Sequence, residues 1–315
     1  MEPNGYRGKI LHVDLSSEEV VERQLDLDVA RAYIGGLGMN AWLMQQTYET
    51  GTDPLSPGNP IIIGAGPLVG AGIPGVAKTV ATTRFPLNAT ISESVGSMRF
   101  ARNLKGAGFD HLIITGRSKK PVVVAVVPGG CSLVDASDLW GLDIFDTTDA
   151  LNKMPEWSRG SVIAIGAAGE NKVAFSLALV DKASTIGRGG LGAVMGSKNV
   201  KALVAAGQGR PTVHDPQSLK SLVNEMRERL KRFKNHRRVL ELGIMENWNN
   251  YIQQMLSCRN FSQACSPEEV TELYGPEVYR SFNVKRLGCP GCFTPDKERL
   301  ELVEGPHKGV ETFTT

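Results

Sequence analysis

The sequence is poor in cysteine and aromatic residues and has no excess of charge of either sign. It contains 5 cysteines, an odd number spread along 315 residues, which does not fit the disulfide framework of a secreted protein. Aromatic residues make up 6% of the chain, and 35 basic side chains nearly balance 33 acidic ones, for a net charge of +2. Such a balance gives no general attraction to nucleic acid or to a membrane surface. We therefore expect neither of them as a partner.

Long apolar segments are also missing. The longest apolar run, PVVVAVV at 121–127, is too short to cross a bilayer, and the start MEPNGYRGKILHVDL has no apolar core of the kind found in secretory signals. We expect a cytoplasmic protein with reduced thiols. Glycine, in contrast, is abundant with 35 residues, which indicates a globular protein with many tight turns.

The first two thirds of the chain contain short β-rich runs bounded by glycine, proline or asparagine. These runs predict strands at 9–15, 60–66, 78–83, 89–94, 111–116, 121–127, 161–166, 173–180 and 200–207. The pattern at 30–46 predicts a helix, although Gly35, Gly36 and Gly38 weaken its middle. Shorter helices are predicted at 100–105 and 146–153.

The sequence changes character at 207–216, GQGRPTVHDP. Asp215 and Pro216 form a typical N-cap and first-turn pair, so a helix is expected to begin there. We interpret 1–208 as an α+β domain with mixed β-structure and short helices, and 209–315 as the start of an all-α domain that is too poor in apolar mass to be complete. The apolar residues that follow recur at helical spacing: Leu219, Leu222, Val223, Met226, Leu230 and Phe233.

The densest motif is STIGRGGLGAVMGSKNVKAL at 184–203. Gly187, Gly189 and Gly192 satisfy the dinucleotide-binding pattern G-x-G-x-x-G, but polar residues stand where a strand should lead into the first glycine. The loop also offers many backbone N–H groups beside Arg188 and Lys198, a combination suited to phosphate. A glycine-rich turn packed between sheets explains the same residues, and both interpretations stay open.

Several segments occur in the order found in a known family. They are GKILHVDLS, YIGGLGMNAWLM, DPLSPGNPIIIGAGPLVG, NLKGAGFDHLIITG, VDASDLWG, AIGAAGEN and GRGGLGAVMGSKNVKAL. Together they resemble the aldehyde ferredoxin oxidoreductase family, tungstopterin enzymes that include the catalytic subunits of class II benzoyl-CoA reductases. The resemblance runs along nearly the whole chain.

The resemblance implies a base domain of two β-sheets that holds a tungsten or molybdenum bis-pterin (tungstopterin or molybdopterin). Helical domains with a 4Fe-4S cluster would follow. The glycine loop would contact the pterin phosphates or the Mg²⁺ ion that bridges them. Lys78 stands where the family has an arginine, while Val95 and Gly96 replace an asparagine–serine turn. The implied cofactor-binding residues are Lys78, Val95, Gly96, Gly187, Arg188, Gly189, Gly190 and Gly192.

Near the end of the chain, Cys289 and Cys292 form a Cys-x-x-Cys pair. They fit the first two places of the family's cluster motif Cys-x-x-Cys-x-x-x-Cys, and the third place falls on Asp296. An aspartate oxygen can bind iron but is a harder ligand than a thiolate. A second alignment gives the pair the later two places and leaves the first to Lys285 or Arg286.

Three interpretations of the pair remain open. The pair, with or without the aspartate, holds a cubane completed by another chain. Alternatively, Cys258 and Cys265 join it in a zinc site, although their spacing is wide for a zinc knuckle. In the third interpretation both thiols are reduced remnants of the motif. Cys131 is expected to be a packed small residue.

The family's reaction is the oxidation of an aldehyde to a carboxylic acid, with electrons passing to ferredoxin or another electron-transfer protein. The motifs of the family's later domains do not occur in this sequence. A separate chain would have to supply those domains, or the protein is a non-catalytic homologue or an assembly subunit. A homodimer is a further arrangement. No catalytic residue is assigned, and the basic stretch 227–238 is either a docking site for an acidic ferredoxin or an ordinary solvated helix face.

Overall fold

The computed structural model describes residues 4–247, 256–275, 278–279 and 281–313. The chain divides into two compact units, Met1–Pro216 and Gln217–Thr315. The predicted boundary at residue 208 lies shortly before this division. The first unit contains two six-stranded sheets, so the fold is of the α+β class that the sequence predicted.

The first sheet has the strand order β2-β1-β6-β3-β4-β5. Strands β1 and β6 pair in parallel and all other neighbours are antiparallel, so the sheet is mixed. Its central strands are buried on both faces, which explains their continuous apolar sequence. The strands are β1 (Lys9–Asp14), β2 (Glu19–Gln24), β3 (Ile61–Ala65), β4 (Thr79–Arg84), β5 (Ile91–Gly96) and β6 (His111–Thr115).

The second sheet has the order β11-β10-β9-β12-β7-β8 and is mixed in the same way, with β7 and β12 parallel. Its edges lie next to those of the first sheet, β11 beside β5 and β8 beside β2. The strands are β7 (Val122–Val127), β8 (Gly130–Asp135), β9 (Ser161–Ala164), β10 (Ala178–Val180), β11 (Ser184–Ile186) and β12 (Val200–Ala205).

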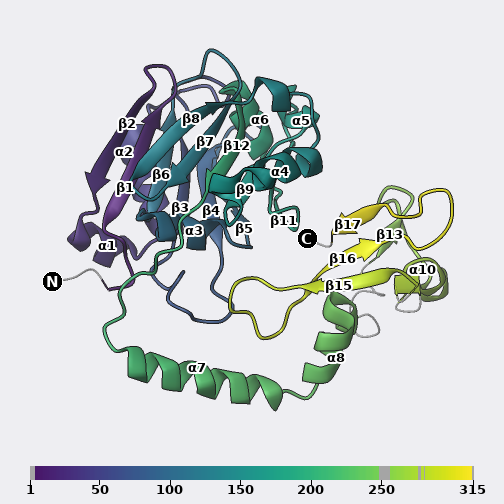
Figure 1. Cartoon of the computed structure of the whole chain (residues 1–315). Coiled ribbons are helices and arrows are strands. Elements are labelled where there is room, and N and C mark those ends of the chain that lie inside the picture. The colour runs from purple at the N-terminus through teal and green to yellow at the C-terminus, as the bar shows by residue number, and fades with distance from the viewer. Residues whose placement is uncertain (1–3, 248–255, 276–277, 280, 314–315) are drawn as a thin grey trace. The chain divides into compact units, whose positions relative to one another are not determined.

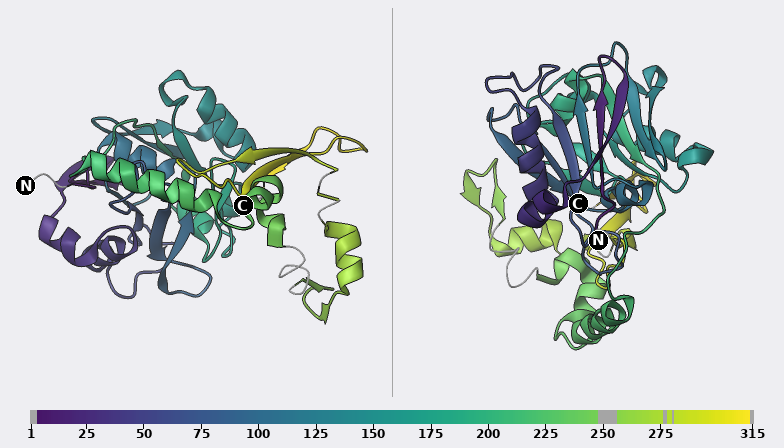
Figure 2. Two further views of the ribbon diagram at one scale, coloured as in Figure 1. Left: turned by 90° about the horizontal axis from the view of Figure 1, so that it is seen from below. Right: turned by 90° about the vertical axis from the view of Figure 1, so that its left-hand side faces the viewer.

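Helices fill and cover the two sheets (Figure 1, Figure 2). Helix α3 packs against strands of both sheets, α2 covers β3 and β4, and α4 packs against β9. Short α5 and α6 pack against each other, and α6 also against β12. The helices are α1 (Leu27–Tyr33), α2 (Leu37–Thr47), α3 (Phe100–Ala107), α4 (Ile144–Lys153), α5 (Ala167–Glu170) and α6 (Leu191–Ser197), with 3-10 turns at Ser137–Leu139 and Pro155–Trp157.

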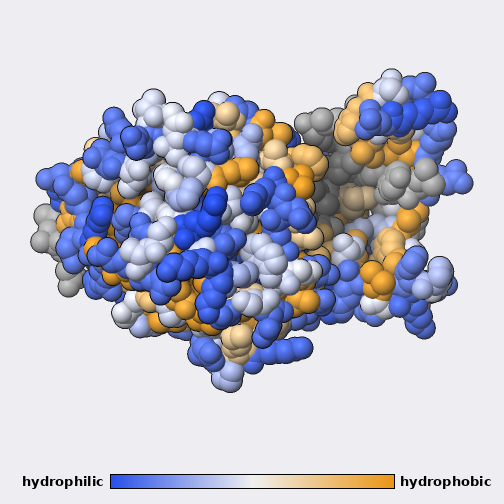
Figure 3. Space-filling model, turned by 90° about the horizontal axis from the view of Figure 1, so that it is seen from above, coloured by the Kyte–Doolittle hydropathy of each residue, from blue (hydrophilic) through white to orange (hydrophobic). Residues whose placement is uncertain are grey.

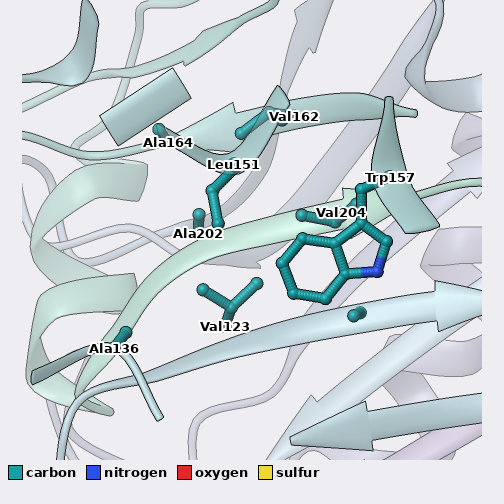
Figure 4. Packing of buried hydrophobic residues seen from close by; sticks show 9 residues of the cluster. Val123, Ala136, Leu151, Trp157, Val162, Ala164, Ala202 and Val204 are labelled. Carbon is teal, nitrogen blue, oxygen red and sulfur yellow. The ribbon is translucent and has the colours of Figure 1, made fainter. Parts of the chain in front are cut away.

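The hydrophobic core under α4 is formed by β-branched side chains of three strands together with residues of one helix and one 3-10 turn (Figure 4). Val123, Val162 and Val204 come from three neighbouring strands and pack with Leu151 of α4 and the indole of Trp157. Each of these side chains is at most 4% exposed. Burying an aliphatic side chain of this size contributes about 1.5–3 kcal/mol, so a few such clusters supply much of the stability of the first unit.

Two sequence predictions for the first unit need correction. The helix predicted at 30–46 is two helices, because the chain turns at Ile34 (φ 65°) and Gly36 (φ 49°), conformations that no α-helix allows. The strand predicted at 173–180 is confined to its last three residues, β10. Strand β2 was not predicted because its side chains are mostly exposed and polar and show no apolar alternation.

The second unit begins with helices and ends with strands. The expected all-α content is therefore wrong for 283–313, which forms a three-stranded antiparallel sheet. The structure pairs the charges of this segment across strands, Arg286 with Glu298 and Arg299 with Glu311. The elements are α7 (Pro216–Lys231), α8 (His236–Leu242), a 3-10 turn (Gly243–Asn247), β13 (Ser257–Cys258), β14 (Gln263–Ala264), α10 (Pro267–Tyr274), β15 (Asn283–Leu287), β16 (Lys297–Glu301) and β17 (Glu311–Phe313).

The face of the molecule drawn in Figure 3 mixes hydrophilic and hydrophobic residues. In the part of the chain that the structure describes, no helix combines the length and the apolar character needed to cross a membrane.

Candidate functional site

Strand β5 brings the residues singled out in the first half of the sequence next to the glycine loop. Lys78 precedes β4, and its Nζ donates a 2.7 Å hydrogen bond to Oγ of Ser97, which follows β5. The backbone N–H of Ser97 donates to Oγ of Ser184 in β11 over 2.9 Å. The start of β4, the end of β5 and the start of β11 therefore meet at one place.

The loop that follows β11 is tied to the same strand. The backbone N–H of Arg188 donates a 3.2 Å hydrogen bond to Oγ of Ser94 in β5. The side chains of Arg188 and Lys78 are exposed, so both cations are available to a ligand in water. The structure thus places two predicted cofactor-binding cations around one short strand, although 110 positions of sequence separate them (188 − 78).

Gly96 permits the close approach of the two sheets. A Cβ atom at this position would lie 2.8 Å from side-chain carbons of Ile186 and of Val180, too close for either to remain in place. The neighbouring residue in β5, Val95, is 40% exposed and offers only an apolar side chain. Of these two predicted site residues, Gly96 therefore has a packing role and Val95 supplies only surface and backbone.

The glycines of the loop divide into packed and open positions. Gly189 has φ +86°, and a Cβ there would lie 2.5 Å from the ring of Phe85. Gly190 has φ +98° and is buried against the carbonyl of Ala174. Gly192, inside α6, is also buried, and a Cβ there would lie 2.6 Å from the carbonyl oxygen of Leu177. Packing therefore explains these three glycines.

Gly187 differs because it is exposed and its virtual Cβ meets nothing closer than 3.4 Å, the side chain of Thr185. Packing does not require a glycine there. The open backbone at Gly187, beside the Arg188 side chain, is the part of the loop that fits a phosphate group, since the N–H of Arg188 itself is bonded to Ser94. Lys198, the other basic residue of the motif, is fully buried and donates to the carbonyls of Pro57 and Gly116, so it is unsuited to a ligand.

The dinucleotide interpretation fails, but for a reason other than the one the sequence suggested. Strand β11 does lead directly into Gly187, contrary to the expectation that polar residues intervene. However, β11 is an edge strand of three residues that pairs antiparallel with β10. The helix after the loop leads to β12, which pairs with β9 and β7 and not with β11, so β11, α6 and β12 do not form a βαβ unit.

Three serines of this region escaped the sequence analysis: Ser94, Ser97 and Ser184. Each is buried and forms one of the hydrogen bonds that join the strands around Lys78 and the glycine loop. The alternation of Ser92 and Ser94 along β5 was the available signal for Ser94, because small hydroxyl residues on one face of a strand suit a close contact between sheets. Nothing in the sequence indicated Ser97 and Ser184 or the partners of the three serines.

The cysteine pair lies in the turn between β15 and β16. The N–H of Cys292 donates a 3.0 Å hydrogen bond to the carbonyl of Cys289, and both thiols are half-buried. Asp296, the predicted third ligand, is exposed. Phe293 stacks under the guanidinium of Arg227, 4.5 Å from the ring centre, which ties the turn to α7. Within the described ranges no three residues of metal-binding type come together, so the chain's own donors present two thiols and not a complete cluster site.

Cys258 and Cys265 form a separate pair on the β13–β14 hairpin. The thiol of Cys258 donates to the carbonyl of Gln263 over 3.7 Å, and the neighbouring Cys258 thiol raises the pKa of Cys265 to about 11. The zinc interpretation, which joins these two thiols to the later pair, finds no support in the described residues, since no group of three ligands forms there. Cys131 is half-buried, and burial raises its pKa to about 12, as expected for an inert packed thiol.

Residues 10–207 match the family described as "Aldehyde ferredoxin oxidoreductase, N-terminal domain". The chain is 33% identical over 227 residues to the tungsten-containing aldehyde ferredoxin oxidoreductase of Pyrococcus furiosus, covering 72% of this chain and 38% of that protein. The corresponding enzyme of Pyrococcus abyssi is 34% identical over 228 residues, with the same coverage. An aliphatic sulfonate oxidoreductase, WOR-like subunit, of Pyrococcus furiosus is 36% identical over 238 residues, 70% of this chain and 38% of that one.

Among solved structures, the active site complex BamBC of benzoyl coenzyme A reductase with 1,5-dienoyl-CoA contains a similar chain. The match has a TM-score of 0.85 and 26% identity, and it covers 99% of this chain and 49% of that one. The chain thus spans less than half of the length of these relatives. The match of residues 10–207 to the family is nevertheless decisive, and the chain belongs to the aldehyde ferredoxin oxidoreductase family, whose N-terminal domain it contains.

Proposed function

We propose that this chain is the pterin-holding part of a tungsten or molybdenum bis-pterin, iron–sulfur oxidoreductase that oxidises aldehydes to carboxylic acids in the cytoplasm, with ferredoxin as electron acceptor. One observation carries the proposal beyond family membership. Lys78 and Arg188, distant in sequence, are both exposed and are fixed around β5 by hydrogen bonds through Ser97 and Ser94.

This arrangement fits the phosphate end of a pterin cofactor. The Lys78 ammonium would neutralise phosphate charge as a point charge, while the Arg188 guanidinium and the N–H of Gly187 would donate hydrogen bonds to phosphate oxygens. When bound, the metal–pterin group supplies the two-electron chemistry. Val95 lacks an amide, so a Mg²⁺ ion at this position would have to take its oxygen ligands from the backbone.

This chain would supply only part of the iron–sulfur cluster site through which electrons leave the pterin. Cys289 and Cys292 would provide two thiolates to a 4Fe-4S cluster, and Asp296, being exposed, would have to reorient to become a third ligand. The remaining ligands and the substrate pocket would come from a separate chain, an arrangement in keeping with the similar chain found in a BamBC complex. The alternative is an assembly subunit or non-catalytic homologue that uses the same phosphate site.

The relatives also indicate which substrate classes to consider. One relative is named an aliphatic sulfonate oxidoreductase and the solved structure contains 1,5-dienoyl-CoA, so sulfonates and CoA thioesters are the competitors of an aldehyde. We place the aldehyde first because the curated relatives named for it match over 72% of the chain.

The decisive experiment measures pterin and metal in the protein purified without oxygen from a cell that makes tungstopterin. Arg188→Ala and Lys78→Ala should each reduce the retained pterin at least about tenfold, since each removes a charge-assisted contact with phosphate. Lys119→Ala, which removes an exposed charge elsewhere in the unit, should retain it. Equal pterin in all three variants, with native circular dichroism, would refute the phosphate role.

Metal content distinguishes the alternatives in the same samples. Tungsten or molybdenum together with iron supports the enzyme, pterin without iron the assembly subunit, and zinc alone a zinc-stabilised binding module. Cys289→Ser should lower the iron content and leave the pterin in place, because the two groups are held by different parts of the chain.

A further inference from the structure

Helix α3 brings together a group of arginines that the proposed cofactor site does not use. Arg99 caps the helix and Arg102 lies in its first turn, three residues further on. The carbonyl of Arg159 accepts a 3.0 Å hydrogen bond from Nδ2 of Asn103, so the 159 loop packs against the same helix. We call Arg99, Arg102, Arg159 and Arg210 the α3 arginine cluster.

Arg210 reaches this place through the segment that leaves β12. The N–H of Gly209 donates a 3.1 Å hydrogen bond to the carbonyl of Gly106 in α3. The carbonyl of Arg210 accepts a hydrogen bond from the guanidinium of Arg7, which adds a fifth positive charge nearby. Two segments, the 159 loop and residues 209–210, therefore pack against α3, and together with the helix they contribute the four arginines.

The negative charge near the cluster is insufficient to balance it. Asp181, 5% exposed, pairs with Nε of Arg99 at 3.2 Å. In the part of the chain that the structure describes, no ion pair is formed by Arg102, Arg159 or Arg210. Burial, together with the nearby charges of Arg210, Arg99 and Arg159, lowers the pKa of Arg102. The repulsion among these guanidinium groups is thus not relieved within the described chain, and an anion would relieve it.

The chemistry of the cluster selects the kind of anion. Guanidinium groups present planar forks of N–H donors that match phosphate oxygens in pairs. The segments that carry Arg102, Arg159 and Arg210 meet at the carbonyl of Arg159, which accepts 3.0 Å hydrogen bonds from Nδ2 of Asn103 and from Nε2 of Gln208. The positive charge is therefore concentrated on a compact surface rather than along an extended groove, in keeping with the lowered pKa of Arg102. A compact dianion fits this distribution better than an extended acidic peptide does. No aromatic residue belongs to the cluster, which disfavours a single-stranded nucleic acid held by stacking.

We propose that the α3 arginine cluster binds a phosphate or diphosphate group, either free or as the end of an organic phosphate ester. Its four arginines are different side chains from Arg188 and Lys78 of the pterin phosphate site, although Ser97, the partner of Lys78, lies only two residues before Arg99. The ligand of the cluster is a second anion in this proposal, and the Arg188 variant below tests whether the two sites are independent.

The test is calorimetric titration of the full chain with inorganic pyrophosphate at low salt. The double variant Arg102→Gln/Arg159→Gln removes two guanidiniums but keeps the backbone carbonyl of residue 159 for Asn103. We expect its affinity to fall at least about tenfold, since each lost charge-assisted hydrogen bond contributes this much. The matched control Lys119→Gln, which removes an exposed charge outside both groups, should keep the affinity, and Arg188→Gln is measured beside it so that pyrophosphate bound at the glycine loop is recognised. Adenosine diphosphate that binds more tightly than pyrophosphate identifies an ester as the ligand; equal binding identifies the free anion.

Several outcomes would overturn the proposal. Unchanged pyrophosphate binding in the double variant would do so, as would binding that is lost only in Arg188→Gln, which places the anion at the glycine loop. If polyglutamate bound more tightly than pyrophosphate, the ligand of the cluster would be an acidic protein segment and not a phosphate. Should the double variant fail to fold, the exposed Arg210→Gln must still weaken pyrophosphate binding severalfold. Pterin retention in the Arg188 and Lys78 variants tests the proposed function separately.

Discussion

His111 is a buried histidine whose replacement should change how the stability of the first unit depends on pH. It lies at the start of β6, fully buried, and its Nδ1 is 2.8 Å from Oδ1 of Asn40 in α2. The Asn40 amide donates to the carbonyls of Ile62 and Val80, so its oxygen faces the imidazole as an acceptor and Nδ1 carries the hydrogen. The other ring nitrogen, Nε2, is buried and has no hydrogen-bond partner among the described residues.

A proton on Nε2 would therefore create a buried charge with nothing to stabilise it. Burial, with a further contribution from the nearby ammonium of Lys105, lowers the pKa of His111 from 6.5 to about 3. Below pH 6.5 the unfolded chain binds a proton at this histidine and the folded chain does not, so the free energy of unfolding falls as the pH falls. Each pH unit costs about 1.4 kcal/mol, or roughly 2.5 kcal/mol between about pH 6.5 and 4.5.

The substitution His111→Leu should remove this pH dependence. At neutral pH the variant loses one hydrogen bond and leaves Oδ1 of Asn40 unpaired, a cost of about 1–3 kcal/mol. Because leucine does not titrate, the difference between wild type and variant should shrink or reverse as the pH falls to about 4.5. Carboxylates that titrate in the same range, in either protein, cancel in this difference.

Urea unfolding followed by tryptophan fluorescence, at several pH values in this range, measures the difference. The variant His214→Gln, which changes an exposed histidine, should follow the wild-type curve. If the His111→Leu curve stays parallel to wild type down to about pH 4.5, then His111 is protonated in the folded protein and the reasoning from burial is wrong.

Two further substitutions test the packing of the first unit. Gly189→Ala places a Cβ 2.5 Å from the ring of Phe85 in a backbone with φ +86°, so thermal unfolding should show a loss of about 2 kcal/mol or more, whereas Gly187→Ala, with its nearest contact at 3.4 Å, should lose less than about 1 kcal/mol. Equal losses would contradict the division of the loop into packed and open glycines. Lys201→Met leaves the buried carboxylate of Glu170 without its partner and should cost about 3–5 kcal/mol in chemical unfolding, while a loss below about 1 kcal/mol would show that the pair contributes little.

Much of the fold could be predicted because local signals and tertiary packing agree in it. The apolar runs at 61–65, 111–115 and 122–127 are strands in the structure, since a continuous apolar strand needs two covered faces and the two sheets and their helices provide them. Prediction failed where tertiary contacts override the local pattern. The chain turns at Ile34 despite a helical sequence, and the charged stretch 297–301 is a strand because its charges pair across the sheet.

The candidate site shows the same limit. The glycine loop and Lys78 could be selected from the sequence, but the reason for each glycine could not, because Phe85, Ala174 and Leu177 are distant in sequence and only the packed chain brings them within contact. The hydrogen bonds of Ser94, Ser97 and Ser184 were equally out of reach.

By itself, the sequence determined the family, the α+β class and the identity of the residues that carry charge or thiols, since these follow from motif order, apolar periodicity and side-chain chemistry. Only the tertiary structure decided which of these residues meet. In the structure, Lys78 and Arg188 are exposed around β5, whereas Lys198 is buried and unsuited to a ligand. Arginines from α3 and from two further segments lie together at this helix. The physical reason is that position in space depends on long-range strand pairing and packing, which leave no local trace in the sequence.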